Sequence, residues 1–247
     1  MSGHNKWSSI KHTKGKNDAA MSKIFSKIGK EIAVAVKLGG PDPNSNPRLR
    51  NIIQKAKQNN MPNDNISRSI KKASGETNSI NYESITYEGY GPAGSAIIVE
   101  TLTDNKNRTA SDVRHLFDRF GGSLGSTNCV SYLFKRKGLI IVEKGVGVSE
   151  DDLMMTALDS GADDVANFDM YYEIYTSPEA FDGVKDYFDE HKIPYVSAEV
   201  TLLPDNYIDL PEEKLKSFNK LVEALEDSDD VQEVYHNVNL PEEDEEE

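Results

Sequence analysis

The chain has 247 residues, a mass of 27.5 kDa and a mean hydropathy of −0.60, and 37% of its residues are hydrophobic. This length suggests two or three domains, and the composition excludes a wholly disordered chain. No apolar run approaches the roughly 20 residues of a membrane-spanning helix, and the first ten residues lack the apolar core of a signal peptide. The single cysteine, Cys129, excludes an internal disulfide framework, so we expect a cytoplasmic protein.

The charge is distributed unevenly along the chain. The net charge of −14 taken alone argues against nucleic-acid binding. Residues 1–75, however, contain 15 Lys and Arg against 4 Asp and Glu, a net charge of +11, whereas the remaining 172 residues carry −25. This asymmetry predicts a basic module attached to an acidic body, so that a polyanion would be attracted to one end and repelled by the other.

A basic arm and a long helix are expected at the N-terminal end. Residues 1–17 have no clear period, and a helix follows from Ala19 with Asp18 as its N-cap and ends at the glycines before Pro41. Apolar positions recur with helical spacing in this segment, which places its lysines together on the opposite face, toward solvent. These lysines are Lys23, Lys27, Lys30 and Lys37.

Two shorter helices are expected to complete a basic domain over residues 1–75. The first begins near Pro47, a favourable first-turn residue, and the segment NNMPND ends it. The second ends at Gly75. Both have an apolar face and several Lys or Arg residues outside it, so we predict a three-helix bundle with a basic surface.

After Gly75 the period of the apolar residues changes, and strands alternate with helices. Thr109 or Ser111 is expected to cap the first of these helices, and Ser149 the second. In chain order, we predict strands over 84–88 and 95–102, a helix over 109–120, strands over 130–134 and 139–143, a helix over 149–160, strands over 164–168 and 170–176, a helix over 178–191, a strand over 195–203, a helix over 211–226 and a strand over 231–237.

The order of these elements predicts an α+β fold with one domain inserted in another. Residues 138–203 have the order β-α-β-β-α-β of a ferredoxin-like domain, whereas the preceding segment lacks a second helix and a closing strand, which residues 211–237 supply. We therefore expect a basic helical domain followed by two ferredoxin-like α+β domains. The predicted domains are 1–75, then 76–134 together with 206–240, then 135–205 as the insertion, with a disordered acidic tail over 241–247.

The motifs that could indicate a catalytic or metal site are weak in this sequence. Gly89, Gly91 and Gly94 match G-x-G-x-x-G, but a strand follows where a nucleotide site needs a helix, which favours a hairpin turn. The five histidines lack ligand spacing, the acidic clusters lack a calcium-loop pattern, and Cys129 is interpreted as a structural thiol. We expect no catalytic residues, no metal, no cofactor and no small-molecule substrate. The alternative is an enzyme acting between the acidic domains, which a cluster of strongly shifted pKa values would support.

The basic N-terminal region is the informative feature. Acidic residues are nearly absent from it, so its charges are not neutralised by pairs within the helices. Trp7 lies among Lys6, Lys11, His12 and Lys14, a combination that suits base stacking beside phosphate contacts; the alternative is a hydrophobic plug against the bundle. No helix-turn-helix signature is present, so sequence-specific binding is not implied.

Two further expectations concern particular segments. The polar loop TDNKNRT, residues 103–109, is either a plain connection from strand to helix or a second contact surface, and the connection is favoured. Changing Lys23, Lys27 and Lys30 to Glu is expected to abolish polyanion binding and to leave the fold intact.

Several long stretches carry a family resemblance. These are SGHNKWSSIKH at 2–12, GGPDPNSNPRLR at 39–50, AKQNNMPNDNISRSIKKASG at 56–75, YEGYGPAG at 87–94, TDNKNRTASDVRHLF at 103–117 and GSLG at 122–125. With these motifs the chain resembles the YebC/PmpR family of bacterial proteins, which has a mitochondrial relative that activates translation of cytochrome oxidase. The resemblance implies three domains, a helical one and two of α+β type, and no recognised catalytic residues.

The resemblance also implies a regulator of gene expression. A DNA-binding transcriptional regulator is the main hypothesis, and the alternative is a ribosome-associated translation factor that binds ribosomal RNA and relieves stalling at proline-rich stretches. No membrane partner is expected. From the matched motifs and the basic surface, the candidate nucleic-acid-binding residues are Lys6, Trp7, Lys11, His12, Lys14, Lys16, Lys23, Lys27, Lys30, Arg48, Arg50 and Lys55.

Overall fold

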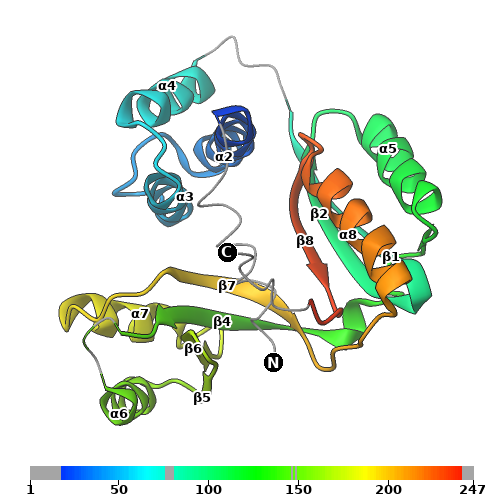
Figure 1. Ribbon diagram of the computed structural model, residues 1–247. Coiled ribbons are helices and arrows are strands. Elements are labelled where there is room, and N and C mark those ends of the chain that lie inside the picture. Colours follow the sequence, from blue (N-terminus) through cyan, green and yellow to red (C-terminus); the bar gives the residue numbers. More distant parts are fainter. Residues whose placement is uncertain (1–17, 76–80, 146, 148, 241–247) are drawn as a thin grey trace. The chain divides into compact units, whose positions relative to one another are not determined.

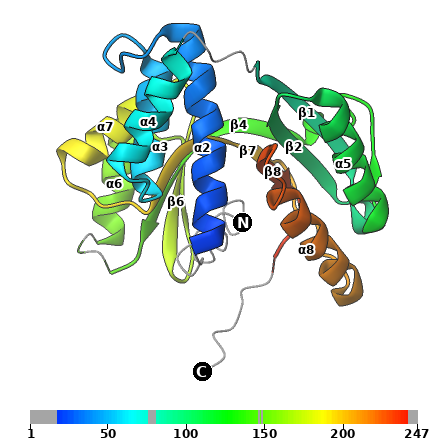
Figure 2. The ribbon, with the colours of Figure 1, turned by 90° about the horizontal axis from the view of Figure 1, so that it is seen from above.

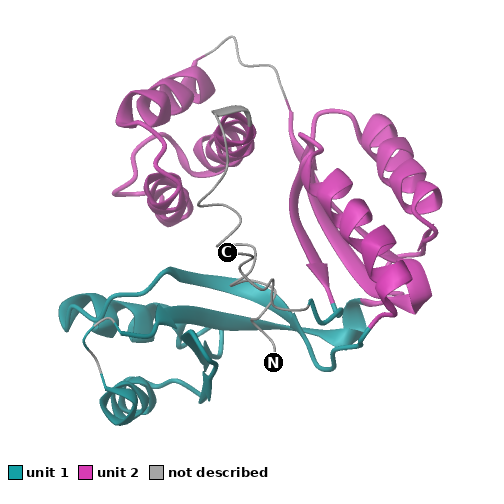
Figure 3. Cartoon of the chain, in the orientation of Figure 1, with its two compact units in different colours: residues 1–13, 131–209, 237–247 teal, residues 14–130, 210–236 magenta. Residues whose placement is uncertain are grey.

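The computed structural model describes residues 18–75, 81–145, 147 and 149–240. Apart from the gaps in these ranges, the described residues divide into two compact units (Figure 3): unit 1 contains 131–209 and 237–240, and unit 2 contains 18–130 and 210–236. Unit 2 includes the N-terminal helices together with the first sheet. The segment 135–205, predicted as an inserted domain, lies in unit 1, and the predicted acidic tail 241–247 lies outside the described residues.

The N-terminal helices form a bundle in which α2 (Asp18–Gly39) packs against both α3 (Pro47–Gln58) and α4 (Asn63–Ser74), as Figures 1 and 2 show. Each helix buries the apolar stripe that its sequence period predicts. The buried side chains are Ile28, Ile32, Ala35 and Val36 of α2, Leu49, Ile52 and Ala56 of α3, Ile66 of α4, and Met61 between α3 and α4.

Asn46 joins the end of α2 to the beginning of α3. Its buried side chain donates from Nδ2 to the carbonyl oxygens of Ala35 and Gly40, both at 2.8 Å, and accepts a hydrogen bond from the amide of Leu49 at 3.0 Å. It therefore acts as the N-cap of α3 and satisfies carbonyl groups at the C-terminal end of α2. Gly40 has a φ of +85°, a conformation that glycine adopts without strain.

The first sheet, in unit 2, has the strand order β3-β1-β2-β8, and its neighbouring strands are antiparallel. Its strands are β1 (Glu83–Tyr90), β2 (Ala96–Thr103), β3 (Ser123–Leu124) and β8 (Val231–His236). The helices α5 (Lys106–Arg119) and α8 (Glu212–Glu226) lie next to each other along this sheet (Figure 1). Val113 and Phe117 of α5 and Phe218, Leu221 and Leu225 of α8 are fully buried.

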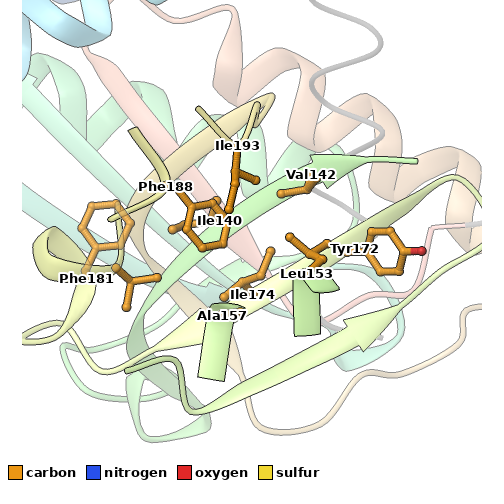
Figure 4. Packing of buried hydrophobic residues seen from close by; sticks show 10 residues of the cluster. Ile140, Val142, Leu153, Ala157, Tyr172, Ile174, Phe181, Phe188 and Ile193 are labelled. Carbon is orange, nitrogen blue, oxygen red and sulfur yellow. The ribbon is translucent and has the colours of Figure 1, made fainter. Parts of the chain in front are cut away.

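The second sheet, in unit 1, has the strand order β5-β6-β4-β7 with antiparallel neighbours. Its elements are β4 (Phe134–Glu143), α6 (Glu150–Ser160), β5 (Asp164–Asn167), β6 (Tyr171–Thr176), α7 (Phe181–Glu190) and β7 (Ser197–Pro204). Leu153 and Ala157 of α6 and Phe181 and Phe188 of α7 pack with Ile140 and Ile174 of the sheet (Figure 4). A second apolar cluster contains Leu139 and Ile141, which alternate with Ile140 and Val142, so β4 is apolar on both faces.

This topology confirms the predicted α+β fold. Unit 1 has the β-α-β-β-α-β order, and α8 and β8 complete the first sheet from a distant part of the chain. The prediction that Gly89, Gly91 and Gly94 belong to a hairpin is also confirmed, because β1 pairs with β2 and the turn Pro92–Gly94 lies between them. No helix in the described ranges is both long enough and apolar enough to cross a membrane.

The structure differs from the predicted elements in several places. The strands expected over 130–134 and 139–143 are one strand, β4, preceded by a 3-10 turn over Ser131–Leu133. The short strand β3 was not predicted, because two residues carry no periodic signal. The helix expected to begin at Thr109 begins at Lys106, because Asn105 is its N-cap and accepts a hydrogen bond from the amide of Arg108 at 3.1 Å.

Candidate nucleic-acid interface

Most of the exposed cations of the bundle lie on α3 and α4. The two helices contain seven Lys and Arg residues and one acidic residue, Asp64. On α4 the buried Ile66 faces the bundle, and helical geometry places Arg68, Lys71 and Lys72 on the outward face, where all three are exposed. We call these three residues the α4 triplet.

Most of these cations have no ionic partner among the residues that the structure describes. Within the described ranges, no ion pair involves Arg48, Lys57 or any member of the α4 triplet. Arg48 and Lys57 are exposed as well. Five positive charges are therefore accessible to an external anion without first breaking a salt bridge.

The candidate residues predicted from sequence fall into three groups. Lys6, Trp7, Lys11, His12, Lys14 and Lys16 lie outside the described residues. On α3, Arg48 is exposed, whereas Arg50 donates to the carbonyl oxygens of Pro43 and Asn44, both at 3.3 Å, and Lys55 pairs with Glu31 at 2.9 Å and with Glu233 of β8 at 3.3 Å. The third group is on α2.

Lys23, Lys27 and Lys30, here called the α2 lysine row, were expected to face solvent but contact residues 226–230 at the end of α8. Lys23 Nζ lies 2.9 Å from a carboxylate oxygen of Asp227, and Lys27 Nζ donates to the carbonyl oxygen of Glu226 at 2.6 Å. Lys30 Nζ donates to the carbonyl oxygen of Asp229 at 2.8 Å and to Asp230 Oδ1 at 2.7 Å.

Residues 226–230, here called the acidic turn, contain four carboxylates and the carbonyl groups that a helix leaves unpaired at its C-terminal end. These oxygens attract the lysines of α2. These contacts argue against the sequence-based expectation that the triple Lys→Glu change leaves the fold intact. That change would replace three cations with three carboxylates against the acidic turn.

The contacts along the α2 lysine row differ in burial. The side chains of Lys23 and Asp227 are 42% and 75% exposed, so their ion pair contributes at most about 1 kcal/mol. The side chains of Lys30 and Asp230 are 17% and 10% exposed. Removing one partner of a buried pair leaves the other charge uncompensated and costs about 3–5 kcal/mol, so the Lys30 end is the firmly attached one.

Asp230 accepts hydrogen bonds from several elements of unit 2. Its Oδ2 accepts from Arg108 Nη2 and Thr109 Oγ1, both at 2.8 Å, and from Thr103 Oγ1 at 3.1 Å, while its carbonyl oxygen accepts from the amide of Leu102 at 2.7 Å. Burial acts to raise the pKa of this carboxyl, but the hydrogen bonds from Arg108, Lys30 and Thr109 outweigh it and hold the pKa well below its usual range. Asp230 therefore stays ionised and links α2, the end of β2 and the start of α5.

The importance of Asp230 and Arg108 is not evident from the sequence. The segment 103–109 is favoured as a plain connection by its sequence, but in the structure Arg108 and Thr109 of this segment bind Asp230, and hydrogen bonds to Asp230 and Asp104 raise the pKa of the Arg108 guanidinium. The motif TDNKNRT was the one feature of the sequence that could have pointed to Arg108. It could not show that its partner is more than 120 residues away in the chain.

An open depression of about 370 Å³ lies beside Asp230. Its lining contains Lys30, Tyr82, Asp104, Arg108, Asp112 and residues 228–230. Carboxylates outnumber cations in this lining, which disfavours a phosphate ligand. No group of three or more His, Cys, Asp or Glu residues suited to a metal is found within the described ranges.

Cys129 lies in a setting that suits a structural thiol. Burial and the neighbouring Glu88 carboxylate raise the pKa of the Cys129 thiol. Glu88 is itself buried and accepts hydrogen bonds from the amides of Asn128 and Val130 at 2.8 and 2.9 Å. The thiol therefore remains protonated at neutral pH, unlike the activated thiolate of a cysteine nucleophile.

Comparisons with known proteins identify the family. Residues 5–76 match the model of the TACO1/YebC protein N-terminal domain, and residues 82–238 match that of the TACO1/YebC second and third domain. A protein of Clostridium botulinum named "probable transcriptional regulatory protein" is 55% identical over 242 residues, 98% of each chain. One of the same name from Acetivibrio thermocellus is 56% identical over 238 residues, 96% of this chain and 98% of that one.

A solved structure agrees with these matches. The crystal structure of a conserved hypothetical protein from Aquifex aeolicus has a TM-score of 0.81 and 45% identity, and the match covers 94% of this chain and 96% of that one. The resemblance noted from the sequence motifs is thereby confirmed: the chain belongs to the TACO1/YebC family.

Proposed function

We propose that this protein is a cytoplasmic, non-enzymatic regulator of transcription that binds DNA through its helical bundle. The observation that carries the proposal is the set of five exposed cations on α3 and α4 whose side chains make neither an ion pair nor a hydrogen bond within the described ranges. The name "probable transcriptional regulatory protein" of its relatives supports duplex DNA as the target. Lys6, Trp7, Lys11, His12, Lys14 and Lys16 belong to the same proposed interface.

The proposed binding is to phosphates. Lys and Arg side chains that contact phosphates release condensed counterions, which supplies affinity that falls steeply with salt concentration. Such contacts position a protein on the duplex but carry no sequence information. We therefore propose that the bundle supplies affinity, and that the excess of acidic residues after position 75 orients the polyanion toward the bundle by repulsion.

The α4 triplet provides the test of this proposal. The variant Arg68→Gln, Lys71→Gln and Lys72→Gln removes three exposed positive charges that have no described ionic partner, so the fold should be retained. We expect a loss of duplex affinity of at least ~10-fold at about 100 mM salt, because up to three phosphate contacts are lost. Each contact contributes roughly 0.9 to the slope of log K against log salt, and so adds affinity at low salt. Fluorescence anisotropy with a labelled 24-base-pair duplex measures this affinity.

The matched control carries the same change of net charge on α8. In it, the exposed residues Lys214, Lys216 and Lys220 are replaced by Gln. If both variants lose affinity equally, net charge alone accounts for binding and the interface is not on α4. If wild-type protein binds a ribosomal RNA fragment far more tightly than the duplex under the same conditions, translation rather than transcription is the function.

A further inference from the structure

We infer that the acidic turn is an internal competitor for nucleic acid: its oxygens occupy the α2 lysine row, so that Lys23 and Lys27 form a second, covered phosphate-binding surface. This inference rests on the proposed function, and it concerns how the interface is regulated. It names the ligand class, the phosphates of a polynucleotide, and the segment of the chain that must move before that ligand reaches α2.

The geometry of the contact supports a phosphate-binding row. Lys23, Lys27 and Lys30 recur at intervals of four and three residues and so project from one face of α2. Each ammonium group lies within 3 Å of an oxygen of the acidic turn, and these oxygens are carboxylate and carbonyl groups. Phosphate oxygens are acceptors of the same kind, so one lysine row fits either partner.

The partners of the row come from a distant part of the chain. The hydrogen bonds of Lys27 and Lys30 span 199 or 200 residues of sequence. On α2 itself Glu31 pairs with Lys55 of α3. Neutralisation of the row therefore depends on α8 and the acidic turn remaining in place, and displacement of the turn would restore the positive face that the sequence of α2 predicts.

The difference in burial along the row indicates which part opens. Lys30 is held by the nearly buried Asp230, which Arg108, Thr103 and Thr109 fix in turn. Lys23 and Asp227 are both solvent-accessible, and the hydrogen bond from Lys27 to Glu226 is exposed. Screened contacts of this kind exchange partners readily, so a polyanion displaces the turn from Lys23 and Lys27 while the Lys30–Asp230 pair remains.

Zero-length cross-linking tests the competition directly. A carbodiimide joins a carboxylate to an amine only when the two are in contact, so the Lys23–Asp227 pair should give an isopeptide bond that peptide mass spectrometry detects. A saturating 24-base-pair duplex should suppress this product by more than half. Asp227→Asn and Lys23→Arg are controls that cannot form it. If the bond fails to form without DNA, or forms equally well with DNA bound, the inference is wrong.

Charge neutralisation of the turn gives an independent measurement. In the variant Glu226→Gln, Asp227→Asn and Asp229→Asn, duplex affinity should rise about fivefold, because the competing charges are removed while Asp230 is kept. A control with the exposed Asp151, Asp159 and Asp163 of unit 1 changed to Asn has the same net charge and should change affinity less than ~2-fold. Equal changes in both variants would overturn the inference.

The two proposals fail in different ways. If the α4 triplet variant binds DNA as well as wild type does, the proposed function fails. If that variant loses binding but the turn variant behaves like its control, the interface on α3 and α4 stands and the internal competitor does not.

Discussion

At the scale of single residues, Asp230 determines how the bundle is attached to the rest of unit 2. Four side-chain donors, from Lys30, Thr103, Arg108 and Thr109, converge on one carboxylate that is nearly buried. Loss of the negative charge would leave the Lys30 ammonium, whose side chain is 17% exposed, without its counter-charge. Arg108, whose side chain is 48% exposed, would keep its ion pair with Asp104.

This arrangement predicts a pH-dependent contribution to stability. Because the pKa of Asp230 is lower in the folded than in the unfolded protein, its contribution is complete above the unfolded value, near 4, and is lost as the pH falls toward the folded value. Asp230→Asn should lower the free energy of unfolding by about 2–4 kcal/mol at pH 7. Urea denaturation at pH 7 and in the acid range measures this difference, which should shrink as the pH falls below 4.

Asp227→Asn is the matched control for this experiment. Asp227 also pairs with a lysine of α2, but its side chain is 75% exposed, so its loss should cost less than about 1 kcal/mol. Equal losses in the two variants, or a difference that stays constant with pH, would show that Asp230 does not have the assigned role.

The contacts of individual side chains were the hardest feature to predict from the sequence. The basic residues of α3 and α4 could be predicted because their charge is evident from composition alone. The contacts of Lys23, Lys27 and Lys30 with the acidic turn could not be predicted. The periodicity of α2 shows which face is polar, but not which distant segment covers that face. Asp230 carried no local signal, since its partners come from separate segments of the chain.

At the scale of elements, Asn46 controls the junction between α2 and α3. Its side chain makes three hydrogen bonds, and it is 4% exposed. Asn46→Ala should therefore lower the free energy of unfolding by about 2–3 kcal/mol, because a helix cap is lost together with two hydrogen bonds to carbonyl groups, one of them buried. Thermal or urea unfolding followed by circular dichroism measures this loss.

Asn44→Ala is the control for this prediction, because Asn44 is an exposed residue of the same loop. Its substitution should change stability by less than about 0.5 kcal/mol. A similar effect of the two substitutions would mean that the junction does not depend on the Asn46 side chain.

Element types could be predicted where the apolar period is long and regular. The three bundle helices, α6, α7 and α8 follow such periods, and Ser149 caps α6 as expected, accepting a hydrogen bond from the amide of Asp152 at 3.2 Å. The start of α5 was misplaced because two plausible caps, Thr109 and Ser111, lie inside the helix, and Thr109 instead hydrogen-bonds to Thr103 and Asp230. Tertiary contacts decided that boundary.

At the scale of the whole molecule, the charge asymmetry has two consequences within unit 2. Part of the positive charge of the bundle is balanced by the acidic turn and by Glu233 of β8. The exposed cations of α3 and α4 remain and form the proposed interface. The segregation of charge could be predicted from sequence, whereas this partial neutralisation required the fold, because α8 and β8 join the first sheet only through the chain topology.

The central claim is that this bundle binds nucleic-acid phosphates, and the salt dependence of duplex affinity tests it most directly. Titrating wild-type protein into the labelled duplex between about 50 and about 200 mM salt should give a linear fall of log K with log salt. The slope should become shallower by about 3 in the α4 triplet variant, since each phosphate contact contributes roughly 0.9. An affinity that does not vary with salt, or a slope that the variant leaves unchanged, would contradict the claim.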